Sequence, residues 1–171
     1  MNDPVTDPAF AQAVDIALTV NGERVRARVD ARRHLTDFLR LDLGLTGAHA
    51  GCEQGVCGAC TIRVNGQAVR GCLTLAVQAD GAEVWTVEGI SDTGELRDLQ
   101  DAFLARNALQ CGFCTPGMLF SAAELLAGGA APDRAAIREH LSGNYCRCTG
   151  YEAIVDAVEA TAKARHAEGA A

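Results

Sequence analysis

The eight cysteines constrain this chain more than any other feature, because they fall into two sets of four with different spacing. The sets are Cys52, Cys57, Cys60 and Cys72, then Cys111, Cys114, Cys146 and Cys148. Four disulfides would suit a small secreted protein that lacks a sizeable core. With 171 residues, 49% of them hydrophobic, this chain can bury a core without such cross-links. We therefore expect the cysteines to be metal ligands or redox groups in two sites.

Charge and hydropathy narrow the classes of partner. Fifteen basic and 22 acidic residues give a net charge of −7, which argues against nucleic acid and against an anionic membrane surface as the main partner. No apolar run approaches the roughly 18 residues of a membrane-spanning helix, so we expect no membrane insertion. The first residues, Met1 to Pro8, carry no basic segment of a secretory signal. We therefore expect a cytoplasmic location.

The first cysteine set has the spacing of a plant-type [2Fe–2S] site. The pattern is Cys-x4-Cys-x2-Cys from residue 52, followed by Cys72 after eleven further residues. Three glycines between residues 51 and 58 would let the backbone adopt positive φ angles and turn its N–H groups toward the sulfurs of a cluster. A structural zinc site more often shows two matched Cys-x2-Cys pairs. The first set therefore favours an iron–sulfur cluster.

The second set consists of two cysteine pairs and is less specific. Cys111-x2-Cys114 is followed, after 31 residues, by Cys146-x-Cys148. Tetrathiolate sites built from two cysteine pairs also bind zinc. The spacing alone therefore leaves an iron–sulfur cluster and a zinc ion open.

A helix is predicted to begin directly after each pair of the second set. Thr115 is the expected N-cap of one helix, with Pro116 as its first residue. Thr149 and Glu152 form a Thr-x-x-Glu capping box for the other. Two helix N-termini would direct their partial positive charge at one anionic site. A zinc tetrathiolate is anionic as well, so this argument does not decide the metal.

The periodicity of the first half predicts a small α+β module over residues 14–90. Hairpin turns are expected at Asn21-Gly22 and at Asn65-Gly66, each between alternating apolar and polar residues. A short helix is expected over residues 35–43 and a further strand over residues 84–87. Residues 1–13 are expected to form a mobile N-terminal tail.

The second half is predicted to be helical over residues 94–162. Apolar residues at helical spacing indicate four helices, near 96–104, 118–126, 133–143 and 151–162. Residues 88–94 are expected to carry the crossing between the two domains, and residues 163–171 to form a C-terminal tail. The predicted fold class is therefore α+β, with a helical domain after the first module.

Three motif stretches resemble the small iron–sulfur subunit of the molybdenum hydroxylases, the family of xanthine dehydrogenase, aldehyde oxidoreductase and carbon monoxide dehydrogenase. They are Gly51–Thr61 (GCEQGVCGACT), Gln110–Gly117 (QCGFCTPG) and Leu141–Tyr151 (LSGNYCRCTGY). The resemblance covers about residues 14–162, with no departure at any ligand position. The last two stretches together are highly specific.

The resemblance implies two [2Fe–2S] clusters in one chain. The first cysteine set would bind an outer cluster in a plant-ferredoxin-like β-grasp domain. The second set would bind an inner cluster in a C-terminal four-helix bundle domain. Gln110 and Cys148 match the family residues that contact the molybdopterin cofactor, expected as a cytosine dinucleotide, of a large partner subunit. A medium subunit would bind FAD near the outer cluster.

The resemblance also implies the function. The chain would relay single electrons from the molybdopterin centre of the large subunit through both clusters to FAD or another acceptor. It would be an enzyme only as the iron–sulfur subunit of an oxidoreductase, without a catalytic residue of its own. Two other interpretations remain: an autonomous ferredoxin-like carrier and a zinc-binding structural protein. The sequence does not distinguish an aldehyde, an N-heterocycle, a purine or carbon monoxide as substrate.

Overall fold

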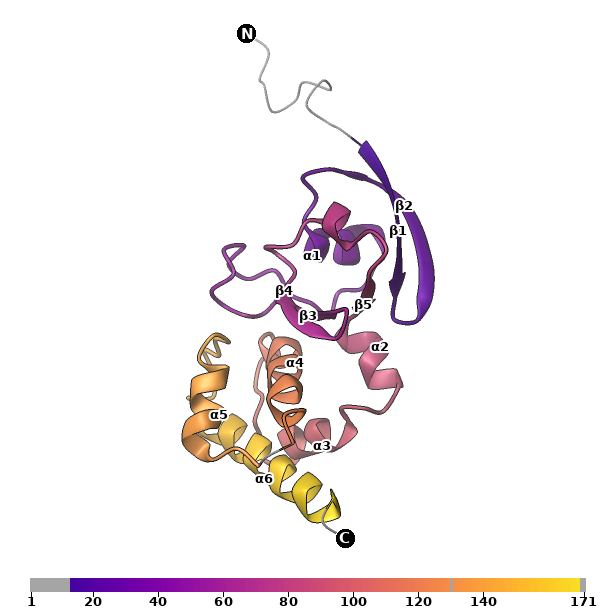
Figure 1. Cartoon of the computed structure of the whole chain (residues 1–171). Helices are drawn as coiled ribbons and strands as arrows, with labels where there is room; N and C mark the ends of the chain where they lie inside the picture. Colours follow the sequence, from indigo (N-terminus) through magenta and orange to yellow (C-terminus); the bar gives the residue numbers. More distant parts are fainter. Residues whose placement is uncertain (1–12, 130, 170–171) are drawn as a thin grey trace.

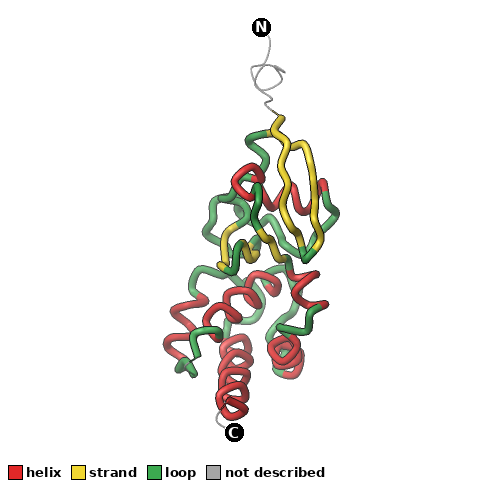
Figure 2. The backbone as a smooth tube through the Cα atoms, turned by 45° about the vertical axis from the view of Figure 1, so that its right-hand side comes forward, coloured by secondary structure: helices red, strands yellow, loops and turns green. Residues whose placement is uncertain are grey.

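The computed structural model describes residues 13–129 and 131–169. A five-stranded sheet with short helices occupies one end of the molecule, and the longer helices occupy the other (Figures 1 and 2). The expected N-terminal tail, residues 1–13, lies outside the described residues except for Ala13, which begins the first strand. No helix in the described part of the chain is long and apolar enough to cross a membrane.

The sheet is mixed, with the order β2-β1-β5-β3-β4. Its strands are β1 (Ala13–Val20), β2 (Glu23–Asp30), β3 (Thr61–Val64), β4 (Gln67–Arg70) and β5 (Glu83–Trp85). β1 pairs antiparallel with β2 and parallel with β5, while β3 pairs antiparallel with both β4 and β5. Both expected hairpins are confirmed.

The two hairpin turns use the residues that their backbone conformation requires. Asn21 and Gly22 have φ angles of 51° and 82°, and Asn65 and Gly66 have φ angles of 48° and 83°. Two successive positive φ angles define the tight turn whose twist matches that of the flanking strands, and Asn-Gly tolerates this turn best.

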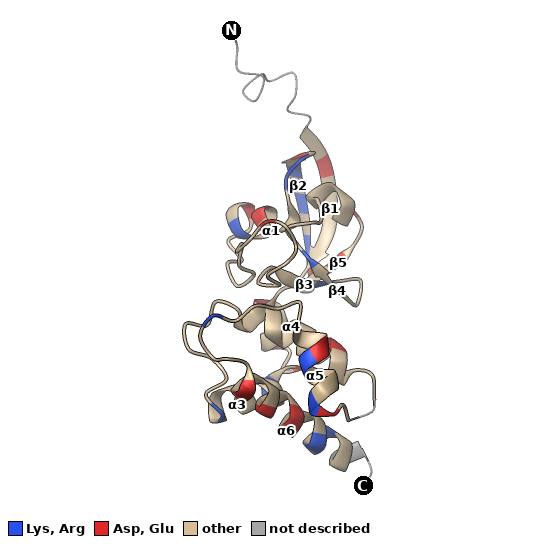
Figure 3. Cartoon of the chain, turned by 90° about the vertical axis from the view of Figure 1, so that its left-hand side faces the viewer, with Lys and Arg blue, Asp and Glu red and all other residues tan. Residues whose placement is uncertain are grey.

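Alternation along β1 and β2 separates a buried face from an exposed face. Ile16, Leu18 and Val20 are buried, and they pack with the helical segments α1 (Leu35–Asp37) and η2 (Phe38–Asp42) in the first hydrophobic core. The exposed face of β2 carries arginines, coloured blue in Figure 3. One further short segment, η3 (Ala76–Ala79), adds two buried alanines to this core.

The second half contains five helices in the described residues, one more than expected. They are α2 (Val87–Asp92), α3 (Arg97–Ala105), α4 (Thr115–Leu126), α5 (Arg134–Leu141) and α6 (Glu152–Gly169). α2 occupies most of residues 88–94, the segment expected to carry the crossing between the domains. The expected tail after residue 162 was wrong as far as residue 169, because α6 continues to Gly169.

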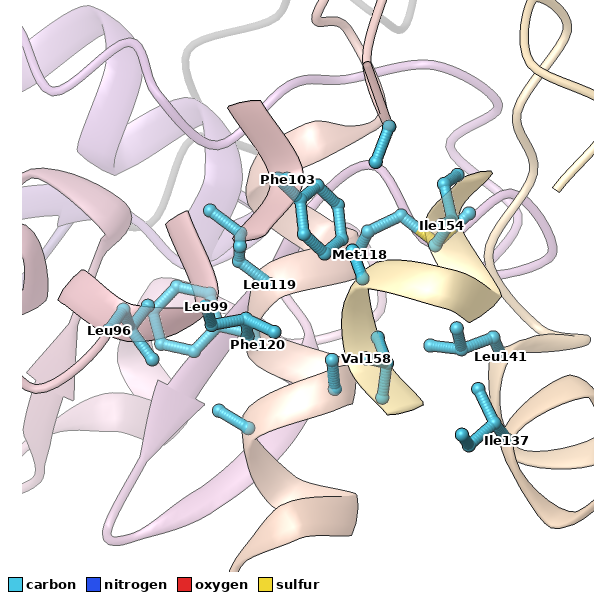
Figure 4. Close-up of a cluster of buried hydrophobic side chains, with 14 of the residues drawn as sticks. Leu96, Leu99, Phe103, Met118, Leu119, Phe120, Ile137, Leu141, Ile154 and Val158 are labelled. Atoms are coloured by element: carbon cyan, nitrogen blue, oxygen red, sulfur yellow. The ribbon is translucent and has the colours of Figure 1, made fainter. Parts of the chain in front are cut away.

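The second hydrophobic core lies between α3, α4, α5 and α6, and Figure 4 shows its side chains. Its buried members include Leu96, Leu99, Phe103, Met118, Phe120, Ile137, Leu141 and Ile154. All residues from Gly117 to Ala123 are buried, because α4 contacts strands β3 and β4 as well as α3 and α5. α4 is therefore the helix that joins the two halves of the molecule.

One ion pair connects the C-terminal part of α6 to α3. Arg165 Nε and Nη2 lie 2.7 and 2.9 Å from the two carboxylate oxygens of Asp98. This hydrogen-bonded arginine lowers the pKa of Asp98 below its usual range. The pair holds helix residues that have no apolar face of their own.

We predict that Asp98→Asn lowers the free energy of unfolding by about 0.5 kcal/mol at pH 7, because the pair is partly exposed and screened. A carboxyl with a depressed folded pKa stabilises the fold above its unfolded pKa of about 3.9. That stabilisation is lost as the pH falls through the lower folded pKa. Urea unfolding of both proteins should therefore show a difference at pH 7 that disappears near about pH 2.

Asp101→Asn is the matched control for this prediction, since Asp101 is exposed on the same helix. It should leave stability nearly unchanged at either pH. A difference between the native protein and Asp98→Asn that persists in acid would contradict a role for the ion pair.

Candidate iron–sulfur sites

The loop between η2 and β3 presents the first three cysteines of the first set. The backbone N–H groups of Gln54 and Cys57 each donate to Cys52 Sγ at 3.4 Å. These two donors lower the pKa of Cys52 to about 7, because they stabilise its thiolate. Gly55 and Gly58 have the positive φ angles, 79° and 73°, that the glycine-rich sequence predicted. The loop therefore directs backbone dipoles at sulfur.

The hairpin of β3 and β4 positions the other end of this set. Cys60 directly precedes β3 and Cys72 follows β4, and Gly71 N donates to Cys60 O at 3.1 Å. Both cysteines are buried. Burial raises the pKa of Cys72 to about 11, and the adjacent thiols of Cys60 and Cys52 act in the same direction. The thiols of the first set thus lie close enough to one another to shift each other's pKa values.

The second set is gathered by the start of α4 and by the loop before α6. Cys111 Sγ lies 3.5 Å from Cys148 Sγ, and both residues are exposed. Cys114 is buried, and this burial raises its pKa to about 12, reinforced by the adjacent Cys146. The structure therefore brings together the two pairs that lie 31 residues apart in the sequence.

Thr149 acts on a sulfur and not as the first residue of a capping box. Its hydroxyl donates to Cys146 Sγ at 3.1 Å and accepts from Tyr151 N at 3.2 Å. Glu152 instead pairs with the side chains of Arg134 and Arg138. The expected capping box was wrong, because the cysteine loop uses the threonine hydroxyl.

The hydroxyl and backbone N–H of Thr149 also change the electrostatics of Cys146. Partial burial raises the pKa of Cys146, but these donors and neighbouring backbone N–H groups outweigh it, so the pKa lies below its ordinary value. Tyr151 supports the same loop, since its phenol oxygen accepts from Cys146 N at 3.0 Å.

The start of α4 also differs from expectation. The helix begins at Thr115, so Cys114 and not Thr115 is the N-cap, and Pro116 is the second helical residue. Thr115 Oγ1 is buried without a hydrogen-bond partner in the described part of the chain. A cysteine of the second set thus occupies the helix terminus itself.

Gln110 lies beside the exposed cysteines of the second set. Its Nε2 donates to the carbonyl oxygen of Cys148 at 3.1 Å. The two residues singled out for cofactor contact are therefore adjacent in space, although they are 38 positions apart.

A backbone hydrogen bond connects the loops that carry the two cysteine sets. Tyr145 N donates to the carbonyl oxygen of Cys57 at 2.8 Å, and Tyr145 directly precedes Cys146. One hydrogen bond and one peptide unit thus connect a cysteine of the first set to a cysteine of the second. The sequence motif contains Tyr145, but nothing in its spacing indicates this contact.

Close packing of two glycines makes that hydrogen bond possible. A Cβ at Gly117 would overlap the carbonyl oxygen of Gly58, and a Cβ at Gly58 would lie 2.7 Å from the side chain of Asn144. Asn144 is buried, and its Oδ1 accepts from Ser121 Oγ at 2.9 Å and from Arg70 Nη2 at 3.1 Å. These contacts fix the first cysteine loop against α4.

His49 and Phe113 form a second contact between the two cysteine loops. Their rings stack with centroids 4.5 Å apart and an interplanar angle of 16°. His49 Nδ1 also donates to the carbonyl oxygen of Phe113 at 2.9 Å. Sequence reasoning assigned neither residue to the site, because their proximity depends on tertiary structure.

The donor atoms fit iron–sulfur clusters. A [2Fe–2S] cluster needs two thiolate pairs, one pair for each iron. The two gathered sets each offer four thiols, with backbone and hydroxyl donors directed at their sulfurs.

Two family models match consecutive parts of the chain. The model described as "2Fe-2S iron-sulfur cluster binding domain" matches residues 18–85. The model described as "[2Fe-2S] binding domain" matches residues 86–159. Each matched segment contains one of the two cysteine sets.

Full-length relatives and solved structures agree with this match. The nicotine 6-hydroxylase small subunit of Paenarthrobacter nicotinovorans is 55% identical over 154 residues, covering 90% of this chain and 93% of the relative. A chain of quinoline 2-oxidoreductase from Pseudomonas putida 86 is 52% identical with a TM-score of 0.82, covering 90% and 96% of the two chains. Aldehyde oxidoreductase from Desulfovibrio gigas is 43% identical with a TM-score of 0.82, and the match covers 91% of this chain but 17% of that one.

The fold and the two thiol sets define a protein with two [2Fe–2S]-binding domains in tandem. The matched family models and the relatives also identify the family of the chain. The chain belongs to the family of small iron–sulfur subunits of the molybdenum hydroxylases, which confirms the resemblance in its motifs.

We predict that Gly117→Ala lowers the free energy of unfolding by about 1–3 kcal/mol, because the new Cβ overlaps a backbone oxygen that cannot move cheaply. Gly128→Ala is the control: its Cβ would lie 3.4 Å from the nearest atom, Leu125 O, and stability should change by less than about 0.5 kcal/mol. Urea denaturation measures the free energy of unfolding of both variants. Equal losses of stability in the two variants would refute the proposed role of the glycine contact.

Proposed function

We propose that this chain relays single electrons from the molybdopterin centre of a large subunit to FAD in a medium subunit, or to another acceptor. The observation that carries the proposal is the hydrogen bond from Tyr145 N to the carbonyl oxygen of Cys57, because it links the two cysteine sets directly. An electron-transfer role agrees with the small subunits to which the chain is similar.

Each cysteine set would hold one [2Fe–2S] cluster. The outer cluster would be bound by Cys52, Cys57, Cys60 and Cys72, and the inner one by Cys111, Cys114, Cys146 and Cys148. Such clusters, when bound, supply one-electron redox chemistry. The chain's own contribution is to place the two sets at a fixed separation and to direct hydrogen bonds at their sulfurs, which tune the potentials.

The domain division follows the two cysteine sets. Residues 14–90 would form the plant-ferredoxin-like β-grasp domain, and residues 94–162 the helical domain. The strand order of the sheet supports the first assignment. The neighbouring contacts of α3 with α4 and α6, and of α5 with α4 and α6, support a four-helix bundle.

The exposed end of the second set would face the large subunit. Gln110, Cys111 and Cys148 are exposed there, and the residues Phe113 and Tyr145 are 47% and 56% exposed. Exposed aromatic rings beside polar groups are typical of protein interfaces. Gln110 and Cys148 would there contact molybdopterin, expected as its cytosine dinucleotide.

The FAD-binding medium subunit would lie near the outer cluster, where Val56 and Leu73 are exposed. The Desulfovibrio gigas relative carries the matching stretch within a much longer chain, which supports association with a larger polypeptide. We further propose a cytoplasmic location, because eight cysteines serving as cluster ligands suit a reducing compartment.

We predict that the purified protein contains about four iron atoms per chain and shows two distinguishable [2Fe–2S] EPR signals after reduction. Cys60→Ala should abolish one signal and Cys114→Ala the other, each with a loss of about two iron atoms. Each variant serves as the control for the other. A single signal in the native protein, or zinc in place of iron, would refute the two-cluster assignment.

We predict that Gln110→Ala, in the assembled complex, lowers substrate-dependent dye reduction about tenfold, because one hydrogen bond to the cofactor is lost. Both EPR signals should remain, since Gln110 is not a cluster ligand. Gln67→Ala, an exposed glutamine on β4, is the matched control and should leave the rate unchanged. An unchanged rate of dye reduction in Gln110→Ala would show that this residue does not contact the cofactor.

A further inference from the structure

The outer face of β2 carries a row of three arginines. β2 is an edge strand of the sheet, so one side of its backbone has no partner strand in the described residues. Arg24, Arg26 and Arg28 are exposed, while Val29 on the opposite face is buried. We call these three side chains the arginine row; Figure 3 shows the blue segments along β2.

No ion pair among the described residues includes a member of the arginine row. Two carboxylates lie nearby: Asp15 is opposite Arg28 in the strand register, and Asp15 and Asp80 line a shallow hollow of about 480 Å³ together with Arg26 and Arg28. The Asp80 carboxylate accepts a hydrogen bond from Ala17 N at 2.7 Å. Three arginines beside two carboxylates leave an excess of positive charge on this face, in a chain of net charge −7.

We propose that β2 binds an extended acidic segment of a partner polypeptide as an additional strand, whose alternate carboxylates contact the arginine row. Residues i and i+2 lie about 6.6–6.8 Å apart in any strand, so alternate carboxylates match alternate arginines in spacing. The free edge of β2 supplies backbone hydrogen bonds for such an addition. Guanidinium groups bind carboxylates through two parallel hydrogen bonds.

Two other roles for the arginine row are protection of the edge strand against aggregation and binding of a polyanion. Each would require different features of this face. Charged side chains protect edge strands from aggregation, but lysine or a single charge serves that purpose. A polyanion such as nucleic acid would need positive charge without the strand register or the free backbone edge. The combination of alternate arginines with an unpaired edge favours the acidic strand.

The test uses the purified full chain and two labelled nine-residue peptides of identical composition. In one peptide glutamates alternate with threonines, and in the other the glutamates are contiguous. Fluorescence anisotropy at about 50 mM salt should show the alternating peptide binding about tenfold more tightly. Amide hydrogen exchange should slow along Glu23–Asp30 when it binds. No molybdenum subunit or substrate is involved, so failure here would leave the proposed electron-transfer function untouched.

Charge variants locate the binding surface. Arg26→Glu should weaken binding of the alternating peptide about tenfold, and Arg26→Lys about threefold, because lysine keeps the charge but loses the paired hydrogen bonds. Arg106→Glu is the control, since Arg106 is exposed outside the sheet and should have no effect. Equal binding of the two peptides, equally effective competition by heparin, or no binding at all would overturn the proposal.

Discussion

The arrangement of the two cysteine sets depends on the contact between two glycines, Gly58 in the first cysteine loop and Gly117 in the first turn of α4. Because neither residue has a Cβ, the two backbones approach closely enough for the carbonyl of Cys57 to accept from Tyr145 N. Asn144 then fills the remaining space and satisfies polar groups from both halves. Contacts between backbone segments therefore fix the distance between the two cysteine sets. Side-chain motion changes such a distance little, because the packed backbone is rigid.

Local sequence signals predicted the parts of the structure that local interactions determine. The Asn-Gly turns and the alternation around them predicted the two hairpins. Asp133, the first residue of the helix expected near 133–143, caps α5, with its Oδ1 accepting from Ala136 N at 2.8 Å. Cysteine spacing and the surrounding motifs predicted both thiol sets and the family. In each case residues close in the chain carry the whole signal.

Features that depend on distant contacts could not be predicted in this way. α2 begins after Thr86, whose N–H donates to Asn21 Oδ1 at 2.8 Å across 65 positions. α6 extends past residue 162 through polar residues without apolar periodicity, held by Arg165 on Asp98 and by the Lys163–Glu159 pair. Thr149 has the sequence of a helix cap, but its hydroxyl donates to Cys146 Sγ. The hydrogen bond of Thr149 to the cysteine loop therefore replaces the helix cap that the local sequence predicted.

The hydrogen bond between Tyr145 and Cys57 also has a consequence for biosynthesis. The first cysteine set ends at residue 72, but two of the hydrogen bonds to its loop come from residues 144 and 145. A ribosome delivers the chain from its N-terminus, so the first four thiols emerge long before their loop can close against α4. The site encoded first is therefore completed only after residues of the second half have left the ribosome.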